Sequence, residues 1–459
     1  MTRLAPDRLP RGVALPGYDR ATRGIGIVHF GLGAFTRAHQ AWYTDAAMTQ
    51  GGGDWMIAGV SLRSPAVAAQ LNPQGGLYTV ATRSGEGTQL RVVGSIAEVI
   101  VAPEAPARIV DRLAAPGTAM VTFTVTEAGY CRAPDGSLDP ALAGPGSFYP
   151  LLAEGLARRR AAGLGGVTLL SCDNLADNGR QLERLLGAHL RAHDPALADW
   201  VASQCGFPNA MVDRIVPAVT DADRAMVAAA ICIDDAAAVV TEPFSQWVIE
   251  NRFVRARPEW EAAGAQIVAD VTPFETAKLR MLNGAHSLLA YASLAEGHAH
   301  VHAAIGDAAL RARVDALMRE EAAPTIAAAP GQDLDAYADA LIERFANPAL
   351  NHRLAQIAMD GSQKLPQRWL ATLAENRRMG RRCPAILGGI GAWLRHVRGD
   401  NGAVGDPLAD RLAACWAAAG EAGIVDAVFG PAGVLASAWV PDAEDRATIA
   451  SALRVTMPA

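Results

Sequence analysis

The stretch that decides the fold is GIGIVHFGLGAFTRAHQAWYTDAAM, residues 24–48. It begins with a β-branched run, turns on glycines and continues with residues that are compatible with a helix. A strand followed by a glycine-rich turn and a helix is the first unit of a dinucleotide-binding fold. The segment therefore predicts that the N-terminal part of the chain binds a dinucleotide.

The turn carries two of the three glycines of the dinucleotide-binding fingerprint. Gly31 and Gly33 occupy the first two positions, and Thr36 stands at the third. The first glycine permits a tight turn, the second lets the backbone approach a pyrophosphate, and the helix N-terminus supplies N–H groups and a positive dipole. An ordinary glycine turn is the alternative, which the flanking strand and helix disfavour. We expect the cofactor to contact Gly31, Gly33, Ala34 and Phe35.

Further strands and helices alternate downstream of this unit. Strand-like runs occupy residues 55–62, 118–130 and 166–174, a strand pair is expected within 77–100, and helical runs occupy 150–162 and 180–192. Such alternation predicts an α/β domain with a largely parallel, doubly wound sheet.

The end of the second strand bears on the choice of cofactor. An acidic residue at this tip favours NAD, whereas a basic residue tolerates the 2′-phosphate of NADP. Here the strand runs into Arg63, and Asp54 lies before the strand. Arg63 either accepts a phosphate or is an ordinary surface arginine, so this segment leaves both cofactors open. Thr126, within 118–130, is a further expected cofactor contact.

The pattern changes near residue 270. Downstream, helical periodicity dominates and convincing strands are scarce; the expected helical segments are 305–322, 333–346, 352–359, 365–378, 384–398 and 407–421. We predict a Rossmann-type dinucleotide-binding domain at residues 1–270 and an all-helical C-terminal substrate domain at residues 271–459.

Composition and charge narrow the possible partners. The chain has 459 residues, a formal net charge of -6 and a pI of about 6.0, so a small-molecule partner is expected rather than a nucleic acid. The N-terminus lacks the apolar core of a signal peptide. Apolar runs such as 225–233, expected to be a buried strand or a helix end, are too short to span a membrane. The six cysteines form no C-x-x-C pair, which favours a reduced, cytoplasmic protein.

The segment KLRMLNGAHS, residues 278–287, places polar groups in an otherwise apolar stretch. On an α-helix with about 100° per residue, Glu275, Lys278, Asn283 and His286 fall within an arc of roughly 140°. A desolvated lysine can exchange a proton near neutral pH, and an asparagine amide can donate to an oxygen that gains negative charge. A neutral histidine can orient a substrate hydroxyl. A solvated polar face is the alternative interpretation.

Three further segments bear on the site. SCDNLADNG (171–179) and MVDRIVP (211–217) offer polar groups that favour a functional lysine helix. HRLAQIAMDGSQKLPQR (352–368) offers three cations that can hold a carboxylate, unless they are ordinary surface charge: Arg353, Lys364 and Arg368. HAHVH (298–302) has no cysteine or carboxylate at ligand spacing, so no metal site is expected.

Several of these segments together resemble the long-chain mannitol dehydrogenase family, which comprises polyol dehydrogenases and uronate reductases that need no zinc. The resemblance is carried, in the family's order and over nearly the whole chain, by GIVHFGLGAFTRAHQAWYTD, SCDNLADNG, MVDRIVP, EPFSQWVIE, KLRMLNGAHS and DGSQKLPQR. It implies a Rossmann-type domain followed by a helical domain, with NAD as the cofactor. The form GxGxFxRAH, with Thr36 in place of the third glycine, is that of the family itself.

The resemblance also implies roles for residues at matching motif positions. They are a general acid/base at Lys278, alkoxide-stabilising amides at Asn174 and Asn283, a substrate-hydroxyl contact at His286, substrate-pocket residues at Asp213 and Lys364, and proton transfer to solvent at Glu275.

The expected activity is hydride transfer between NAD and a sugar-derived substrate. EPFSQWVIENRFVRARPEW and IAMDGSQKLPQRWL are most similar to the uronate reductases, which implies interconversion of D-mannonate and D-fructuronate. The alternative is a mannitol or arabinitol 2-dehydrogenase that acts on a neutral polyol. A cofactor-sensing regulator without catalysis is disfavoured, because the four residues of the implied catalytic set are all present.

Overall fold

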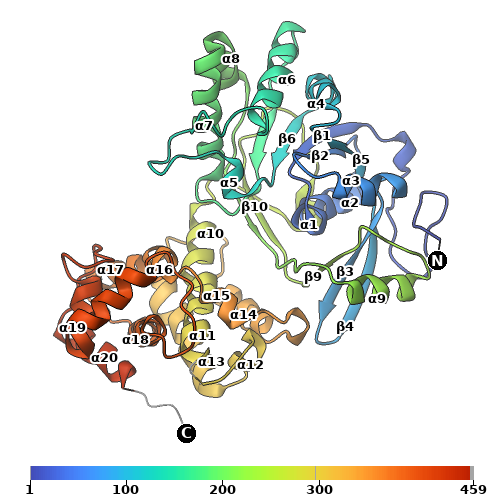
Figure 1. The fold of residues 1–459 in the computed structure, drawn as a ribbon. Helices are drawn as coiled ribbons and strands as arrows, with labels where there is room; N and C mark the ends of the chain where they lie inside the picture. Colours follow the sequence, from blue (N-terminus) through green and yellow to red (C-terminus); the bar gives the residue numbers. More distant parts are fainter. Residues whose placement is uncertain (1, 295, 455–459) are drawn as a thin grey trace. The chain divides into compact units, whose positions relative to one another are not determined.

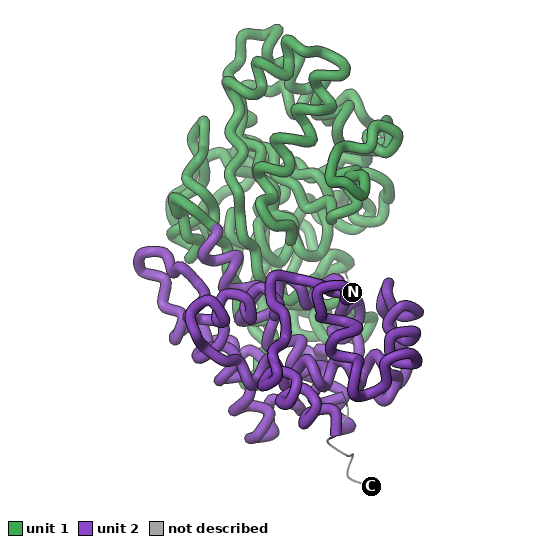
Figure 2. The backbone as a smooth tube through the Cα atoms, turned by 90° about the vertical axis from the view of Figure 1, so that its left-hand side faces the viewer, with its two compact units in different colours: residues 1–271 green, residues 272–459 purple. Residues whose placement is uncertain are grey.

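The computed structural model of the chain describes residues 2–294 and 296–454. It divides into two units, Met1–Val271 and Thr272–Ala459, which Figure 2 draws in different colours. The first unit contains all the strands of the three sheets described below, and the second is built from helices. We describe each unit by itself.

A five-stranded parallel sheet forms the centre of the first unit (Figure 1). Its strand order is β5-β2-β1-β6-β7, and the strands are β1 (Ile25–Phe30), β2 (Met56–Ser61), β5 (Ile96–Val101), β6 (Met120–Phe123) and β7 (Thr168–Ser171). Phe30 pairs with Val60 and with Phe123, and Phe123 pairs with Ser171. Ser61 at the end of β2 also pairs with Val101 at the end of β5, so all five strands end within one residue of each other and the loops that follow them share one edge of the sheet.

Both faces of this sheet are covered. Ile27 of β1 belongs to one buried apolar cluster and its neighbour Val28 to another, because successive side chains on a strand point to opposite faces. The helices of the unit are α1 (Ala34–Ala38), α2 (Gln40–Gly51), α3 (Ala66–Leu71), α4 (Pro106–Ala114), α5 (Thr126–Gly129), α6 (Tyr149–Ala161), α7 (Asn178–His193), α8 (Pro195–Gln204) and α9 (Asp221–Ile231). The predicted doubly wound architecture is confirmed.

Two three-stranded sheets complete the first unit. One has the order β4-β3-β9, with β3 (Tyr78–Ser84), β4 (Gly87–Val93) and β9 (Val239–Thr241); the other has the order β11-β10-β8, with β8 (Ala210–Asp213), β10 (Gln246–Glu250) and β11 (Gln266–Val268). Short 3-10 turns occupy Arg20–Thr22, Asn72–Gln74 and Trp260–Ala263.

The structure corrects one local expectation and decides another between its two alternatives. The expected strand pair within 77–100 is the antiparallel hairpin β3–β4, whereas Ile96–Val101 pairs with β2 in the central sheet. The apolar run 225–233, expected to be a buried strand or a helix end, is a helix end: most of it forms the C-terminal part of α9, which begins with a capping box between Thr220 and Asp223.

The second unit is helical. Its α-helices are α10 (Thr272–Ala277), α11 (Gly284–Leu294), α12 (Val301–Ile305), α13 (Ala308–Ala316), α14 (Leu334–Phe345), α15 (Leu354–Ile357), α16 (Gly361–Leu365), α17 (Ala371–Arg378), α18 (Pro384–Arg398), α19 (Ala409–Phe429) and α20 (Ala443–Leu453). Wider π turns occupy Lys278–Asn283, Leu317–Ala322 and Pro366–Leu370, and 3-10 turns occupy Ala323–Thr325 and Pro348–Leu350. Helices α11 and α18 lie in the core, where Gly389 of α18 approaches the indole of Trp369.

Helix α19 corrects the expectation that no apolar run approaches the length of a membrane span. By length and composition alone, this helix is long and apolar enough to cross a membrane. Its mean hydropathy is 1.4 over an 18-residue window, of which 28% is buried. Gly420 interrupts it with φ 59° and ψ -171°, outside the helical region. Each half on its own is shorter than the ~20 residues that a membrane-spanning helix needs.

Candidate functional site

The glycine turn after β1 has the shape that a dinucleotide needs. Gly31 has a φ of +88°, and a Cβ placed on it would lie 2.1 Å from the carbonyl oxygen of Thr124. Gly33 precedes the first residue of α1, and the nearest atom to a Cβ placed there is the Gly31 carbonyl oxygen at 3.7 Å. The backbone at Gly33 is therefore open to a close approach, which fits a pyrophosphate at this turn.

The third position of the fingerprint carries a hydrogen-bonding side chain rather than a glycine. Thr36 is fully buried, and its Oγ1 lies 2.8 Å from His29 Nε2 and 2.6 Å from Thr124 Oγ1. The other nitrogen of His29, Nδ1, lies 2.7 Å from Thr122 Oγ1. Burial lowers the pKa of His29 to about 3, so its imidazole is neutral. This buried network ties the start of α1 to β1 and β6, and it accounts for a threonine at this position.

Two buried arginines that the sequence analysis missed hold the same region. Arg37 donates to the carbonyl oxygens of Gly33 at 3.2 Å and Ala237 at 2.5 Å. Arg214 donates to the carbonyl oxygens of Ala38 at 2.6 Å and Glu242 at 3.0 Å. An arginine in the largely apolar segments AFTRAHQ and MVDRIVP is the signal that would have indicated them.

The remaining predicted cofactor residues lie near the carboxyl edge of the central sheet. Ala34 and Phe35 are half-buried in α1, where the Phe35 ring stacks on His39 with centroids 5.0 Å apart. Arg63 is exposed two residues after β2 ends, and Thr126 is exposed after β6 with a φ of +65°. Their contacts with a cofactor stay predictions.

Asn174 lies beside an acidic residue that the sequence analysis did not single out. Asp173 is buried, and its carboxylate accepts hydrogen bonds from the amides of Val125 and Thr126 and from the hydroxyl of Tyr130. Burial raises the pKa of Asp173, and these hydrogen bonds oppose the increase. Asn174 itself is exposed, three residues after the end of β7.

A side-chain amide joins the Asn174 segment to β8. Asn178 donates through Nδ2 to the carbonyl oxygens of Asp173 at 3.1 Å and Ala210 at 2.6 Å, and its Oδ1 accepts from the Ala210 amide at 2.9 Å. Asp213, a predicted substrate residue, is buried at the far end of the same strand. The first unit therefore holds Asn174 and Asp213 on directly connected segments.

The lysine helix of the second unit is not a regular α-helix. Lys278–Asn283 forms a π turn, in which the amide of Gly284 donates to the carbonyl oxygen five residues earlier, at Leu279. In an α-helix Lys278 and Asn283 would lie about 140° apart around the axis, whereas a π turn closes on the fifth residue and brings their side chains toward one face. The sequence analysis assumed a regular α-helix here, and this assumption was wrong. The π turn places Lys278 and Asn283 closer to one face than an α-helix would, which favours the predicted cluster.

Lys278 is buried, with 9% of its surface exposed, whereas Glu275 and Asn283 are half-buried. His286, in the first turn of α11, is 8% exposed. Its ring lies 4.8 Å from that of Phe345 and 5.1 Å from that of His352. Burial, followed by the nearby His352, Arg344 and Arg368, holds the pKa of His286 well below its usual range. A neutral imidazole results, which can both donate to and accept from a hydroxyl.

The three cations predicted to hold a carboxylate have different surroundings. Arg353 is exposed just before α15. Lys364 donates to the carbonyl oxygen of Met359 at 2.6 Å, and burial lowers its pKa. Arg368 donates to the Asn283 carbonyl oxygen at 3.3 Å and to Ser287 Oγ at 2.9 Å. Arg368 thus braces the backbone of the lysine helix, whereas Lys364 holds the turn at Met359. A contact of either side chain with substrate stays a prediction.

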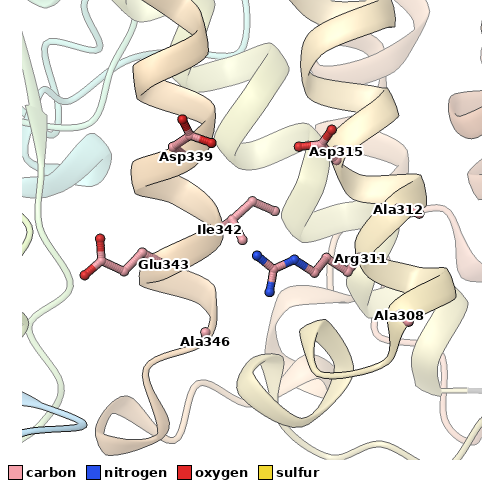
Figure 3. Close-up of a pocket in the computed structure, with 8 residues that line it drawn as sticks. All are labelled: Ala308, Arg311, Ala312, Asp315, Asp339, Ile342, Glu343 and Ala346. Carbon is pink, nitrogen blue, oxygen red and sulfur yellow. The ribbon is translucent and has the colours of Figure 1, made fainter.

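An open pocket of about 590 Å³ lies elsewhere on the second unit, between α13 and α14. Arg311 points into it from α13, opposite Ile342 of α14, and Glu343 also lines the pocket (Figure 3). Its other carboxylates, Asp315 and Asp339, are paired with Arg319. None of the predicted site residues lines it, so we assign it no part in the candidate site.

Comparisons with known proteins match this arrangement. The pattern of the mannitol dehydrogenase Rossmann domain matches residues 25–262, and that of the mannitol dehydrogenase C-terminal domain matches residues 270–434. The chain is 43% identical over 430 residues to the uncharacterized oxidoreductase YeiQ of Escherichia coli K12, which covers 90% of this chain and 88% of YeiQ. It is 42% identical over 415 residues to the D-mannonate oxidoreductase of the same organism, covering 87% and 85%.

A solved structure supports the same relationship. Pseudomonas fluorescens mannitol 2-dehydrogenase, in a ternary complex with NAD and D-mannitol, superposes with a TM-score of 0.80. It is 35% identical in sequence, and the match covers 98% of this chain and 96% of that protein.

Proposed function

Because the chain belongs to the mannitol dehydrogenase family of oxidoreductases, we propose that it is a fructuronate reductase that interconverts D-mannonate and D-fructuronate with NAD. The observation that carries the catalytic part of the proposal is the burial of Lys278 on a π turn with Asn283, one turn before a neutral His286. Burial favours the neutral form of an amine, so a buried lysine can serve as a proton donor and acceptor, and π turns are frequent at functional sites. The glycine turn after β1 would hold the pyrophosphate of NAD.

The reduction of a ketone needs a hydride on carbon and a proton on oxygen. NADH, when bound, supplies the hydride. The carbonyl oxygen gains negative charge as the hydride arrives, and the amides of Asn174 and Asn283 stabilise it by donating hydrogen bonds. Protonated Lys278 then delivers the proton that completes the alcohol. In the oxidation direction neutral Lys278 removes the hydroxyl proton, and Glu275 passes it to solvent.

Positive charge around His286 supports a sugar acid as the substrate. Arg344 and Arg368 lie close enough to lower the pKa of His286, and Arg344 also lowers that of His352. A neutral polyol gains little from such a field, whereas a carboxylate is attracted to it. The identity of 42% to a D-mannonate oxidoreductase supports the same choice.

The second candidate is a mannitol or arabinitol 2-dehydrogenase. One observation favours it: Lys364 and Arg368, two of the three cations predicted to bind a carboxylate, already donate to main-chain carbonyl oxygens. The similarity to a mannitol 2-dehydrogenase of known structure agrees with this alternative.

A spectrophotometric screen separates the two candidates. D-Mannonate, D-altronate, D-mannitol, D-arabinitol and D-sorbitol are each assayed with NAD and with NADP, the latter because the exposed Arg63 can pair with a 2′-phosphate. We expect the highest kcat/KM with D-mannonate and NAD, and with D-fructuronate and NADH in reverse. Higher kcat/KM with a neutral polyol contradicts the sugar-acid assignment, and no turnover of any substrate contradicts the proposed function.

The cysteines bear on the compartment of this enzyme. All six are free. Free thiols suit a reducing compartment, so a cytoplasmic location is part of the proposal.

A further inference from the structure

Asp173 connects two loops at the carboxyl edge of the central sheet. It follows β7 after one intervening residue, and its buried carboxylate reaches the loop after β6. Oδ2 accepts from the Val125 amide at 3.0 Å and from the Tyr130 hydroxyl at 2.9 Å, and Oδ1 accepts from the Thr126 amide at 2.8 Å. One side chain thus satisfies three donors of residues 124–130, which we call the β6 loop. Only a side chain that can accept hydrogen bonds on both of its oxygens can do this.

The loop that Asp173 holds has an unfavourable backbone conformation. Thr126 has a φ of +65°, in the left-handed region that β-branched residues rarely adopt. Such conformations persist where the surrounding structure fixes them. The hydrogen bonds from the amides of Val125 and Thr126 to Asp173 supply this constraint.

The same loop packs directly against the glycine turn. The amide of Thr124 donates to the Phe30 carbonyl oxygen at 2.9 Å, and its hydroxyl donates to the Gly31 carbonyl oxygen at 2.9 Å. Its own carbonyl oxygen occupies the space beside Gly31 that a Cβ would need. A change in the path of the β6 loop must therefore alter the glycine turn as well.

We propose that Asp173 is a positioning residue that shapes the β6 loop for the nicotinamide half of the dinucleotide and places the adjacent amide of Asn174. A dinucleotide crosses the carboxyl ends of the strands. β2, whose tip would read the adenosine ribose, lies on one side of β1, and β6 and β7 lie on the other. The inference rests on the proposed function, because it needs NAD at this edge and Asn174 in the reaction.

The sharpest variant is Asp173→Asn, which keeps the size of the side chain but turns one acceptor oxygen into an NH₂ that opposes donors of the β6 loop. Asp177→Asn is its matched control, since it makes the same charge change in the same segment. The side chain of Asp177 is exposed, and it forms a surface ion pair with Arg180. It also accepts a 3.3 Å hydrogen bond from Asn209 Nδ2, which the amide oxygen of an asparagine can still accept. Its φ of +51° is one that asparagine tolerates. The measurements are NADH affinity by fluorescence titration, kcat and KM, amide hydrogen exchange of residues 124–130 without nucleotide, and melting temperature.

For Asp173→Asn we expect the Kd for NADH to rise by about tenfold or more, as loss of charged hydrogen bonds implies. We also expect faster exchange at the amides of Val125 and Thr126, and a lower kcat at saturating NADH because Asn174 is displaced. Asp177→Asn should keep wild-type values within about twofold, because a surface ion pair contributes little.

A lower melting temperature with unchanged Kd and kcat would assign Asp173 a purely structural role and overturn the proposal. If Asp173→Asn does not fold, Tyr130→Phe removes one donor from the same carboxylate and is expected to raise the Kd by about threefold. An unchanged Kd in that variant overturns the proposal too. A wild-type protein that binds no nucleotide contradicts the proposed function, whereas wild-type binding with an unaffected Asp173→Asn contradicts this inference alone.

Discussion

Gly31 and Gly33 lie two residues apart, yet a methyl group added to each meets different surroundings. At Gly31 it would collide with the Thr124 backbone at a φ of +88°, whereas at Gly33 its nearest neighbour is 3.7 Å away. The first glycine is thus required by the fold of the protein itself. The fold leaves room for a side chain at the second, so we propose that a ligand approaching the backbone closely is what requires a glycine there.

This difference predicts separable effects of two substitutions. Gly31→Ala should lower the free energy of unfolding by about 1–3 kcal/mol or more, because it adds a collision to a left-handed backbone. Gly33→Ala should change that free energy by less than about 0.5 kcal/mol but weaken NADH binding by about tenfold. Urea denaturation and fluorescence titration measure the two quantities. Equal losses of stability in both variants would show that the turn is not built as described.

His29 makes the stability of the first unit depend on pH. Burial lowers its pKa to about 3 from 6.5, so below pH 6.5 the unfolded chain binds a proton that the folded protein does not take up until about pH 3. Stability is therefore fully present above pH 6.5 and falls as the pH decreases through this window. Between pH 6.5 and pH 5 the expected loss from this residue is on the order of 2 kcal/mol.

The contribution of His29 is isolated by comparison with His29→Gln, since other buried histidines titrate in both proteins. The free energy of unfolding is measured in urea at pH 7 and at pH 5. The wild type should lose about 2 kcal/mol more than the variant between these values. Identical pH dependence in the two proteins would mean that His29 is protonated in the folded state.

At the scale of secondary-structure elements, the π turn at Lys278–Asn283 is held in place by a second π turn, Pro366–Leu370. Arg368 from the second turn donates to the carbonyl oxygen of Asn283 and to Ser287, and Trp369 donates to the carbonyl oxygen of Gly284 at 3.2 Å. The widened helix therefore depends on contacts from a segment more than 80 residues away.

This packing predicts the effect of Arg368→Met. The free energy of unfolding should fall by about 1–3 kcal/mol, and kcat should fall for every substrate, because the π turn that carries Lys278 and Asn283 loses its support. Arg411→Met, at an exposed position of α19 outside the predicted site, is the control. If KM instead rises for D-mannonate alone, with kcat and stability unchanged, Arg368 binds the substrate carboxylate as the sequence suggested.

The elements that sequence pattern predicted well are those with long, regular periodicity. The run 384–398 is α18, and 150–162 is α6 with a shift of one residue. The pattern did not show which sheet Ile96–Val101 joins, because a short apolar strand reads the same in a hairpin and in a central sheet. It also missed the π turns, since a wider turn leaves no mark in hydrophobic periodicity and depends on tertiary contacts.

At the scale of the whole molecule, sequence motifs singled out candidate site residues but not the residues that support them. Lys278, Asn283 and His286 stand out because polar groups interrupt an apolar segment. Arg37 supports the glycine turn through Ala237, 200 residues away in sequence, and no local pattern reports such a contact. Asp173 was likewise not identified from the sequence, which drew attention to its neighbour Asn174.

The central claim is that the buried amine of Lys278 exchanges the proton that accompanies hydride transfer. The most direct measurement is kcat of Lys278→Ala at neutral pH, with NADH affinity measured on the same sample and a small primary amine added in a parallel assay. We predict that kcat falls by about 10²–10⁴-fold, that the Kd for NADH stays within about twofold of the wild-type value, and that the added amine restores part of the lost turnover. Turnover close to that of the wild type without added amine would contradict the account.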